Sequence, residues 1–312
     1  MAAKKRGKRF RGLRKIGLIG CGKWGSNILR DLLALNCKVY VVDIDPLAAE
    51  RAVRNGAVDA FTEITGLPVC DGYIVAVPIP DLAKETARLL KYEKPIFSEK
   101  TLCLSSSDYE CLKNAGGEKF IFVMHKWHYH PGVEALRLVM QSGEIGDLQE
   151  LFATRHQWVA DFHGGDVFST LCVHDLTIIK HILGYIPEEI KYARVIQCEN
   201  GFPFSATVVM GERHVAYISV NGKHCSKRSG VSIHGSRGSA ELLNAYDDHI
   251  TIRTDAGGET RRSIDTTFPL FLELKEFVLY LENGPKPRCG LHDAGEIAHV
   301  IYKLKKAAGL SR

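Results

Sequence analysis

Hydrophobic residues in the first part of the chain fall into two alternating patterns. Short continuous apolar runs predict buried strands at 15–20, 38–43, 72–78, 95–100 and 119–125. Between them, segments such as 26–36 place apolar residues at the spacing of one helix face. Repeated strand–helix units predict a doubly wound parallel sheet, with any ligand at the C-terminal ends of its strands.

Beyond about residue 125 the pattern changes. A helix and turn are predicted at 131–148, and a further helix is predicted around His174. Short strands separated by turn residues are predicted at 148–159, 190–198, 204–210, 214–220, 230–236 and 249–254. Consecutive strands at this spacing favour a mostly antiparallel open sheet, closed by helices at 270–284 and 292–309. The predicted fold is an N-terminal Rossmann domain followed by a C-terminal α/β domain.

The length of the chain predicts two domains, and its charge distribution predicts a separate N-terminal arm. A chain of 312 residues is long for one core, which favours two domains, with predicted bounds of 15–125 and 126–312. The first fifteen residues hold eight Lys or Arg and no acid, so the rest of the chain carries a net charge of −3 although the total is +5. Residues 1–14 are predicted to be a flexible basic arm. A solvated tail is favoured over contact with nucleic acid, because no nucleic-acid motif accompanies the arm.

The remaining composition indicates a cytoplasmic protein. The nine cysteines are scattered without a CxxC pair, which fits neither a disulfide framework nor a zinc site. The sequence holds no apolar run of the ~18 residues that a membrane span needs. The basic start is not followed by an apolar region, which argues against a secretory signal.

A glycine-rich turn joins the first predicted strand to the first helix. Gly20, Gly22 and Gly25 form a GxGxxG motif. In such a turn the first glycine permits the bend, the second lets a pyrophosphate approach the backbone, and the third allows close helix packing. The helix N-terminus adds unpaired N–H groups for the phosphates. Lys23 and Trp24, inside the motif, are expected beside the dinucleotide.

The second predicted strand ends in an acid, Asp43, eighteen residues after the last glycine. A carboxylate there can accept hydrogen bonds from both ribose hydroxyls and would repel a 2′-phosphate, so NAD is favoured as cofactor, with NADP possible. Other strand ends also face the expected cofactor. They carry Val77, Pro78, Glu99 and Lys100.

Several segments occur in the order typical of one oxidoreductase family. They are SEKTL (98–102), HYHPGVEALRLVMQSGEIGDL (128–148), GGDVFSTLCVHDLTIIKHILG (164–184), SIHGSRGSAEL (232–242) and PRCGLHDAGEIAHVIYKLKKAA (287–308). From about Lys15 onwards the chain resembles the glucose–fructose oxidoreductase, inositol dehydrogenase and rhizopine-catabolism family (Gfo/Idh/MocA). Thr101 stands where that family usually has proline.

The resemblance implies a Rossmann domain and an α/β domain whose open sheet forms a homodimer or homotetramer interface. It also implies an NAD(P)-dependent dehydrogenase or reductase acting on a CH–OH or C=O carbon of a sugar, cyclitol or nucleotide sugar. Lys100 then polarises the substrate oxygen, and His174 is the acid/base residue.

The chemistry of hydride transfer suits both residues. An alcohol that loses a hydride must also lose its hydroxyl proton, and histidine titrates in the range that a general base needs. A lysine beside the same oxygen stabilises the developing alkoxide. The competing interpretations are an exposed strand-end lysine for Lys100 and a buried core histidine for His174. Glu99 either supports its neighbours or contacts the nicotinamide ribose.

Helix geometry places Thr170 one turn before His174 on the same face, whereas Asp175 points about 100° away. In much of the family an aspartate stands where Thr170 stands and assists the histidine. Threonine can donate a hydrogen bond but cannot stabilise an imidazolium by charge. We therefore expect Thr170 and His174 in the substrate site, without the usual carboxylate.

The segment HKWHYH (125–130) is expected to line the cleft, with Lys126 and His128 contacting cofactor or substrate. Its histidine spacing fits no regular metal site, and no metal is predicted. A rival function is a dinucleotide-binding sensor or assembly subunit of reduced activity, motivated by the missing aspartate and the basic arm. A third possibility keeps the enzyme but changes its substrate to a dihydrodiol, imine or tetrapyrrole.

Overall fold

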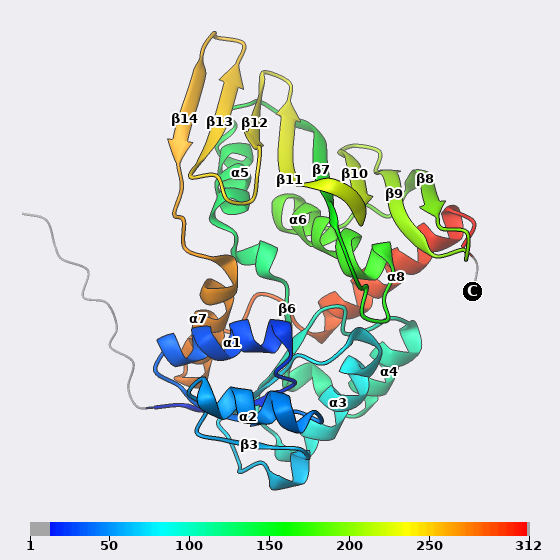
Figure 1. Ribbon diagram of the computed structural model, residues 1–312. Helices are drawn as coiled ribbons and strands as arrows, with labels where there is room; N and C mark the ends of the chain where they lie inside the picture. Colours follow the sequence, from blue (N-terminus) through cyan, green and yellow to red (C-terminus); the bar gives the residue numbers. More distant parts are fainter. Residues whose placement is uncertain (1–12, 311–312) are drawn as a thin grey trace, which may run out of the picture.

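The computed structural model describes residues 13–310. The predicted basic arm lies outside these residues except for its last two, and Arg14 forms an ion pair with Glu282 at 3.7 Å. Two sheets organise the described chain, one above the other in Figure 1. The predicted fold class is confirmed: a parallel Rossmann sheet is joined to a mostly antiparallel sheet.

Within the described residues the first sheet has six parallel strands in the order β3-β2-β1-β4-β5-β6, the order of a dinucleotide-binding Rossmann fold. Its strands are β1 (Lys15–Ile19), β2 (Lys38–Val42), β3 (Asp59–Phe61), β4 (Gly72–Val75), β5 (Ile96–Glu99) and β6 (Ile121–Met124). Its helices are α1 (Lys23–Ala34), α2 (Pro46–Arg54), α3 (Leu82–Leu89) and α4 (Ser106–Asn114). β4, β5 and β6 are buried at every position, as expected of strands covered on both faces.

Over residues 13–310 the second sheet has eight strands in the order β14-β13-β12-β11-β7-β10-β9-β8. Its strands are β7 (Leu148–Trp158), β8 (Ile190–Gln197), β9 (Pro203–Met210), β10 (Val215–Asn221), β11 (Lys223–Gly235), β12 (Gly238–Leu242), β13 (His249–Thr254) and β14 (Glu259–Ser263). Neighbouring strands are antiparallel except for β7 and β10, which run parallel. Burial alternates along β10, so only one face is covered by protein.

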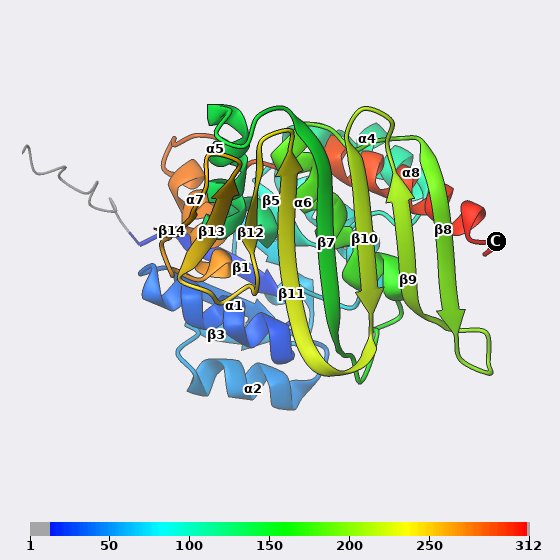
Figure 2. The same cartoon turned by 90° about the horizontal axis from the view of Figure 1, so that it is seen from above.

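The helices α5 (Pro131–Ser142) and α6 (Val173–Leu183) lie behind the second sheet in Figure 2. A π-helical segment, Phe168–Cys172, leads directly into α6. The 3₁₀ segment Lys126–Tyr129 joins β6 to α5.

The last two helices return to the first sheet. In α7 (Pro269–Leu281), Phe277 stacks on Phe97 of β5 with ring centroids 5.0 Å apart. In α8 (Leu291–Ala307), Leu291 belongs to the core that contains β6. The predicted boundary at residue 125 therefore separates the two sheets, but both closing helices contribute side chains to the first core.

Among the described residues, which include all nine cysteines, no disulfide is formed. None of the helices in this part of the chain is long and apolar enough to cross a membrane.

Candidate functional site

The glycine-rich turn between β1 and α1 is shaped by three different constraints. Gly20 has φ +89°, and a Cβ there would lie 2.5 Å from the carbonyl oxygen of Ala76. A Cβ on Gly25 would lie 2.2 Å from the carbonyl oxygen of Gly20, so close packing of α1 needs glycine. A Cβ on Gly22 would have no atom within 4 Å. Gly20 and Gly25 therefore meet the needs of the fold, whereas Gly22 leaves an open cradle.

This cradle fits a dinucleotide. Gly22 is the N-cap of α1 and provides no side-chain cap, so N–H groups of the first turn are available to an anion. Asp43, just after β2, accepts hydrogen bonds from the N–H groups of Cys21 (2.7 Å) and Asp45 (3.0 Å). These bonds hold the carboxylate next to the turn and leave lone pairs for ribose hydroxyls.

The other predicted cofactor contacts lie around the same edge of the sheet. Lys23 is exposed in the first turn of α1, and Val77 and Pro78 follow β4, half-buried and exposed respectively. The main-chain nitrogen of Val77 would lie 3.1 Å from a Cβ on Gly20. The structure thus brings these residues together with the glycine turn.

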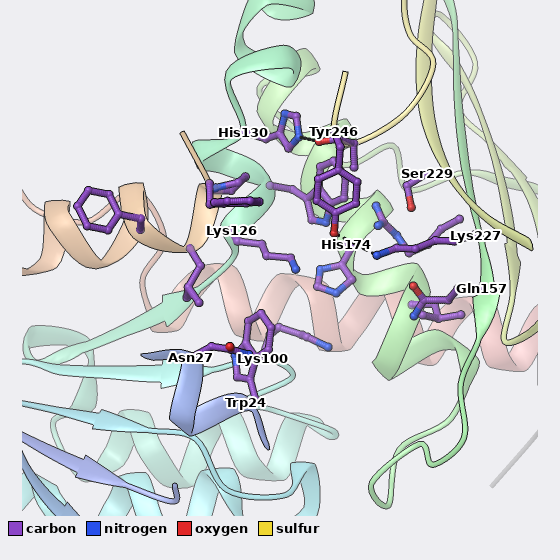
Figure 3. A pocket seen from close by; sticks show the side chains of 18 of the residues that line it. Trp24, Asn27, Lys100, Lys126, His130, Gln157, His174, Lys227, Ser229 and Tyr246 are labelled. Atoms are coloured by element: carbon purple, nitrogen blue, oxygen red, sulfur yellow. Dashed lines mark hydrogen bonds between the residues drawn. The ribbon is translucent and has the colours of Figure 1, made fainter. Parts of the chain in front are cut away.

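A cavity of about 710 Å³ adjoins Trp24 at this edge. Its walls come from α1, from the segments that follow β5 and β6, from β7 and β11 of the second sheet, and from the start of α7 (Figure 3). The lining residues are Trp24, Asn27, Arg30, Asp31, Lys100, Lys126, Trp127, His130, Arg155, Gln157, Thr170, Leu171, His174, Lys227, Ser229, Ala245, Tyr246, Thr267, Phe268, Pro269, Leu270 and Phe271. Five predicted site residues are among them, namely Trp24, Lys100, Lys126, Thr170 and His174.

Lys100 follows β5 and is tied to the π-helical segment of the other domain. Its Nζ donates to the carbonyl oxygen of Thr170 at 3.2 Å, and the Thr101 hydroxyl donates to the carbonyl oxygen of Ser169 at 2.7 Å. The Lys100–Thr101 peptide bond is cis. Burial lowers the pKa of Lys100 to about 8, and the nearby Glu99 charge partly offsets this effect. Lys100 is therefore still mostly cationic at neutral pH.

Glu99 is buried directly behind the cavity wall. Its carboxylate accepts hydrogen bonds from the indole N–H of Trp24 and, at 3.1 Å, from the main-chain N–H of Lys100. Burial raises the pKa of Glu99, and the adjacent Lys100 charge opposes that shift. Because both carboxylate oxygens have protein donors, Glu99 orients Trp24 and the Lys100 backbone.

His174 lies at the start of α6, with its ring in the cavity beside Lys126 in Figure 3. Its Nδ1 is buried and has no hydrogen-bond partner among the described residues, which leaves Nε2 as the nitrogen open to the cavity. Burial lowers the pKa of His174 well below its usual value, and the Lys100 charge lowers it further. His174 is therefore neutral at neutral pH, the form that can accept a proton.

Thr170 shares the cavity with His174, as the helix register predicts. Its hydroxyl donates to the carbonyl oxygen of Phe162 at 3.5 Å, and its own carbonyl accepts from Lys100. Thr170 thus closes the loop that precedes the π-helical segment. Within residues 13–310 no side-chain hydrogen bond joins the Thr170 hydroxyl to the His174 ring.

The segment 125–130 is only partly placed as expected. Lys126 lines the cavity, whereas His128 does not, because its ring packs edge-on against His181 at 4.9 Å. His130 lines the cavity but has a structural role: its Nδ1 accepts from Gly132 N–H at 3.1 Å. The other nitrogen, Nε2, therefore carries the proton and donates to the carbonyl oxygen of Ala245 at 2.9 Å. The described part of the chain contains no group of three His, Cys, Asp or Glu suited to a metal ion.

Sequence reasoning missed Arg155 and the role of Asp175. Arg155 of β7 donates two hydrogen bonds to Asp175 of α6, at 2.8 and 3.2 Å, and both side chains are buried. The guanidinium also lies 4.3 Å over the Trp127 ring. An acid inside an apolar helix signals a buried cation partner, but the sequence does not indicate which residue supplies it.

Replacing Asp175 with asparagine should destabilise the protein by about 3–5 kcal/mol, because the Arg155 cation loses its charge partner in a buried position. Chemical denaturation of the two proteins measures the difference. Asp31→Asn is the matched control: its partner Arg30 is exposed and loses little. Equal stability of Asp175→Asn and wild type would contradict this account of the pair.

Comparisons with known proteins support the same fold. An inositol 2-dehydrogenase from Ralstonia nicotianae is 29% identical, and the match covers 58% of this chain and 58% of that protein. A 2,7-anhydro-N-acetylneuraminate hydratase from Escherichia coli is 25% identical over 56% of this chain and 50% of its own length. The chain thus matches little more than half the length of these curated relatives. No protein-family model matches the chain.

Solved structures match over nearly the whole chain. An oxidoreductase from Agrobacterium radiobacter, in complex with NAD⁺, L-tartaric acid and magnesium, has a TM-score of 0.83 at 16% identity. The match covers 96% of this chain and 98% of that one. A UDP-N-acetylglucosamine 3-dehydrogenase from Acidithiobacillus ferrooxidans also has a TM-score of 0.83, at 17% identity, over 96% of this chain and 99% of the other. At these identities the likeness establishes the fold.

Proposed function

We propose that this chain is an NAD(P)-dependent oxidoreductase that transfers a hydride between nicotinamide and a CH–OH or C=O carbon of a sugar, cyclitol or nucleotide sugar. The observation that carries the proposal is the convergence of Lys100 and His174 on one cavity beside the glycine-rich turn. The inositol dehydrogenase relative and the NAD⁺-bound structural neighbour support the same reaction class.

The cofactor is assigned to the edge of the first sheet. Gly22 and the N-terminus of α1 would hold its pyrophosphate, and Asp43 would hold the adenosine ribose and favour NAD over NADP. Trp24, oriented by Glu99, would form one side of the nicotinamide site. When bound, the nicotinamide supplies the acceptor or donor of the hydride.

The side chains supply the proton chemistry. In oxidation, the neutral His174 accepts the hydroxyl proton of the substrate at Nε2. The Lys100 ammonium, held at the cavity wall by Thr170, donates a hydrogen bond to the same oxygen and stabilises its negative charge. In reduction the proton moves from His174 to the carbonyl oxygen. Substrate orientation falls to the lining residues of β7, β11 and the 245–246 loop.

A substrate screen tests the proposal. Purified protein is incubated with NAD⁺ or NADP⁺ and a panel of sugars, cyclitols and nucleotide sugars, and formation of the reduced cofactor is followed by absorbance. Turnover of at least one compound, with NAD⁺ preferred, is the expected result. Tight NAD⁺ binding without turnover of any compound would instead favour a dinucleotide sensor.

Two glycine substitutions separate cofactor binding from folding. Gly22→Ala should leave the melting temperature unchanged, since its Cβ meets no atom, and should weaken NAD⁺ binding at least tenfold by filling the cradle. Gly25→Ala should lower stability by on the order of 3 kcal/mol, because its Cβ collides with the Gly20 carbonyl. Thermal denaturation and NAD⁺ titration of both variants check the prediction. Unchanged NAD⁺ affinity in Gly22→Ala would place the pyrophosphate elsewhere.

The open face of the second sheet is the proposed contact between copies of the chain. In the described residues no helix lies on this face, which is turned toward the viewer in Figure 2. Phe152 and Tyr217 stack there with ring centroids 4.4 Å apart, and both remain partly exposed. Light scattering should give the mass of a dimer or tetramer, and a monomer mass at micromolar concentration would contradict the proposal.

A further inference from the structure

We infer that the substrate carries an anionic group, a carboxylate or phosphate, which binds to Lys126, Arg155 and Lys227 on the walls of this cavity. This inference rests on the proposed function, because it names the substrate class of that same cavity. It is carried by three cations that retain unused hydrogen-bond donors among the contacts of residues 13–310.

Lys126 is the first of these cations. Its Nζ lies 4.9 Å over the ring of Trp24 and, within the described chain, forms no ion pair or hydrogen bond. The nearby acids are Glu99 and Glu273, both buried, and burial raises the pKa of each. They therefore offset the Lys126 charge incompletely. A half-buried ammonium with only an aromatic partner is a suitable donor for a ligand oxyanion.

Arg155 presents the second cation from β7. Its Nε and one terminal nitrogen are committed to Asp175, and the ring of Trp127 fixes the plane of the guanidinium. The remaining terminal nitrogen, Nη1, makes no hydrogen bond within residues 13–310, and the residue lines the cavity. Arg155 is thus held rigidly with one charged donor group unused, an arrangement that binds an oxyanion without loss of side-chain freedom.

Lys227 of β11 supplies the third cation. Its Nζ donates to the Tyr246 hydroxyl at 3.1 Å and lies 4.9 Å over the Tyr246 ring. Figure 3 shows Lys227 and Tyr246 on the same side of the cavity as Gln157 and Ser229, across from Trp24. A lysine ammonium has three donors, so two remain for a ligand.

Asp175 pairs with Arg155, but the acids that line the cavity do not balance the charges of Lys126 and Lys227. Asp31 is the one carboxylate among the lining residues of the described chain, and it is paired with Arg30 at 2.8 Å. The cofactor phosphates do not account for the cations either. They are assigned to Gly22 and the start of α1, whereas Arg155 and Lys227 belong to the other sheet.

Binding measurements with matched probes test the inference. Calorimetric titrations in the presence of NADH, which cannot oxidise an alcohol, use D-glucose, D-glucuronate and D-glucose 6-phosphate, and myo-inositol with myo-inositol 1-phosphate. At least one anionic compound should bind tenfold or more tightly than its neutral counterpart, and this preference should shrink as NaCl is raised, as expected of an ionic contact. The uronate and phosphate arms distinguish the two kinds of anion. Equal affinity within every pair would overturn the inference.

Two variants locate the anion. Lys126→Met and Lys227→Met should each reduce the preference for the anionic compound about tenfold, and Lys227→Met, which lies away from Trp24, should leave the affinity of its neutral counterpart unchanged. Lys227 is exposed, so its variant is expected to fold normally. Lys223→Met is the matched control, because it removes one charge from the same strand outside the cavity. Loss of the preference in Lys223→Met, or its retention in both cavity variants, would overturn the assignment.

The anion site and the proposed dehydrogenase activity can be refuted separately. Tight binding of an anionic compound that is never oxidised would refute the proposed dehydrogenase and leave the anion site standing. Rapid oxidation of neutral sugars without any preference for their anionic counterparts would support the dehydrogenase and refute the anion site.

Discussion

Lys100→Met lowers kcat/KM by about 10²–10³, the usual cost of removing one preorganised donor to a developing oxyanion. Methionine has nearly the length and volume of lysine, so the variant changes mainly the charge and the hydrogen bond to Thr170. Affinity for NAD⁺ stays near that of the wild type, since Lys100 is not part of the glycine turn. The measurement is steady-state oxidation together with a cofactor titration.

Lys91→Met, on the exposed surface, is the matched control and retains full activity.

The pH profile of oxidation adds a measurement that is specific to the Lys100 ammonium. Because burial lowers the pKa of Lys100 to about 8, its charge is lost as the pH rises through that value. Oxidation should therefore slow above pH 8 in the wild type. In Lys100→Arg this decline moves to higher pH, because guanidinium keeps its proton. Full activity of Lys100→Met would show that Lys100 does not contact the substrate oxygen.

His174→Ala lowers kcat by about 10²–10⁴, the range that general acid–base catalysis contributes. The wild-type enzyme should show no loss of activity between pH 8 and pH 6.5, because burial and the Lys100 charge keep the pKa of His174 well below 6.5. The loss on acidification occurs only at lower pH, where His174 becomes protonated and can no longer accept a proton. Stopped-flow and steady-state measurements across this range test both statements.

Chemical rescue separates a base from a packing residue. The His174→Ala variant leaves space beside Lys100, and added imidazole should restore part of the lost rate without changing stability. His181→Ala, on the same helix and outside the cavity, serves as the control and should not respond to imidazole. Wild-type turnover by His174→Ala would assign His174 to the core and remove it from the proposed mechanism.

The Rossmann half was predictable because its evidence is local. The strand, glycine turn, helix and Asp43 follow one another within about thirty residues, and each has a separate physical reason to be there. Strands of the second sheet were harder. β14, Glu259–Ser263, is exposed at every position and has no hydrophobic pattern to reveal it. The parallel pairing of β7 with β10 joins segments about sixty residues apart, which periodicity does not report.

In the cavity, the sequence predicted the proposed catalytic residues but not the residues that line the rest of its walls. Lys100 and His174 belong to segments whose order resembles a known family, and the structure brings them to one cavity. No sequence motif identifies Arg155, because its pairing with Asp175 arises only when β7 packs on α6. Tyr246 comes from a loop, and its hydroxyl accepts a hydrogen bond from Lys227 of β11. Substrate selectivity therefore resides in residues that a single sequence does not single out.

Because α7 and α8 pack on the first sheet, the two halves of the molecule should unfold together. A fragment ending at residue 125 would lack Phe277 against Phe97 and Leu291 in the core beside β6, so apolar surface on the Rossmann sheet would face water. Nearly 150 residues of the second half are synthesised before those helices exist. The nucleotide-binding sheet therefore completes its core late in synthesis, and heating should produce one cooperative transition in calorimetry, not two.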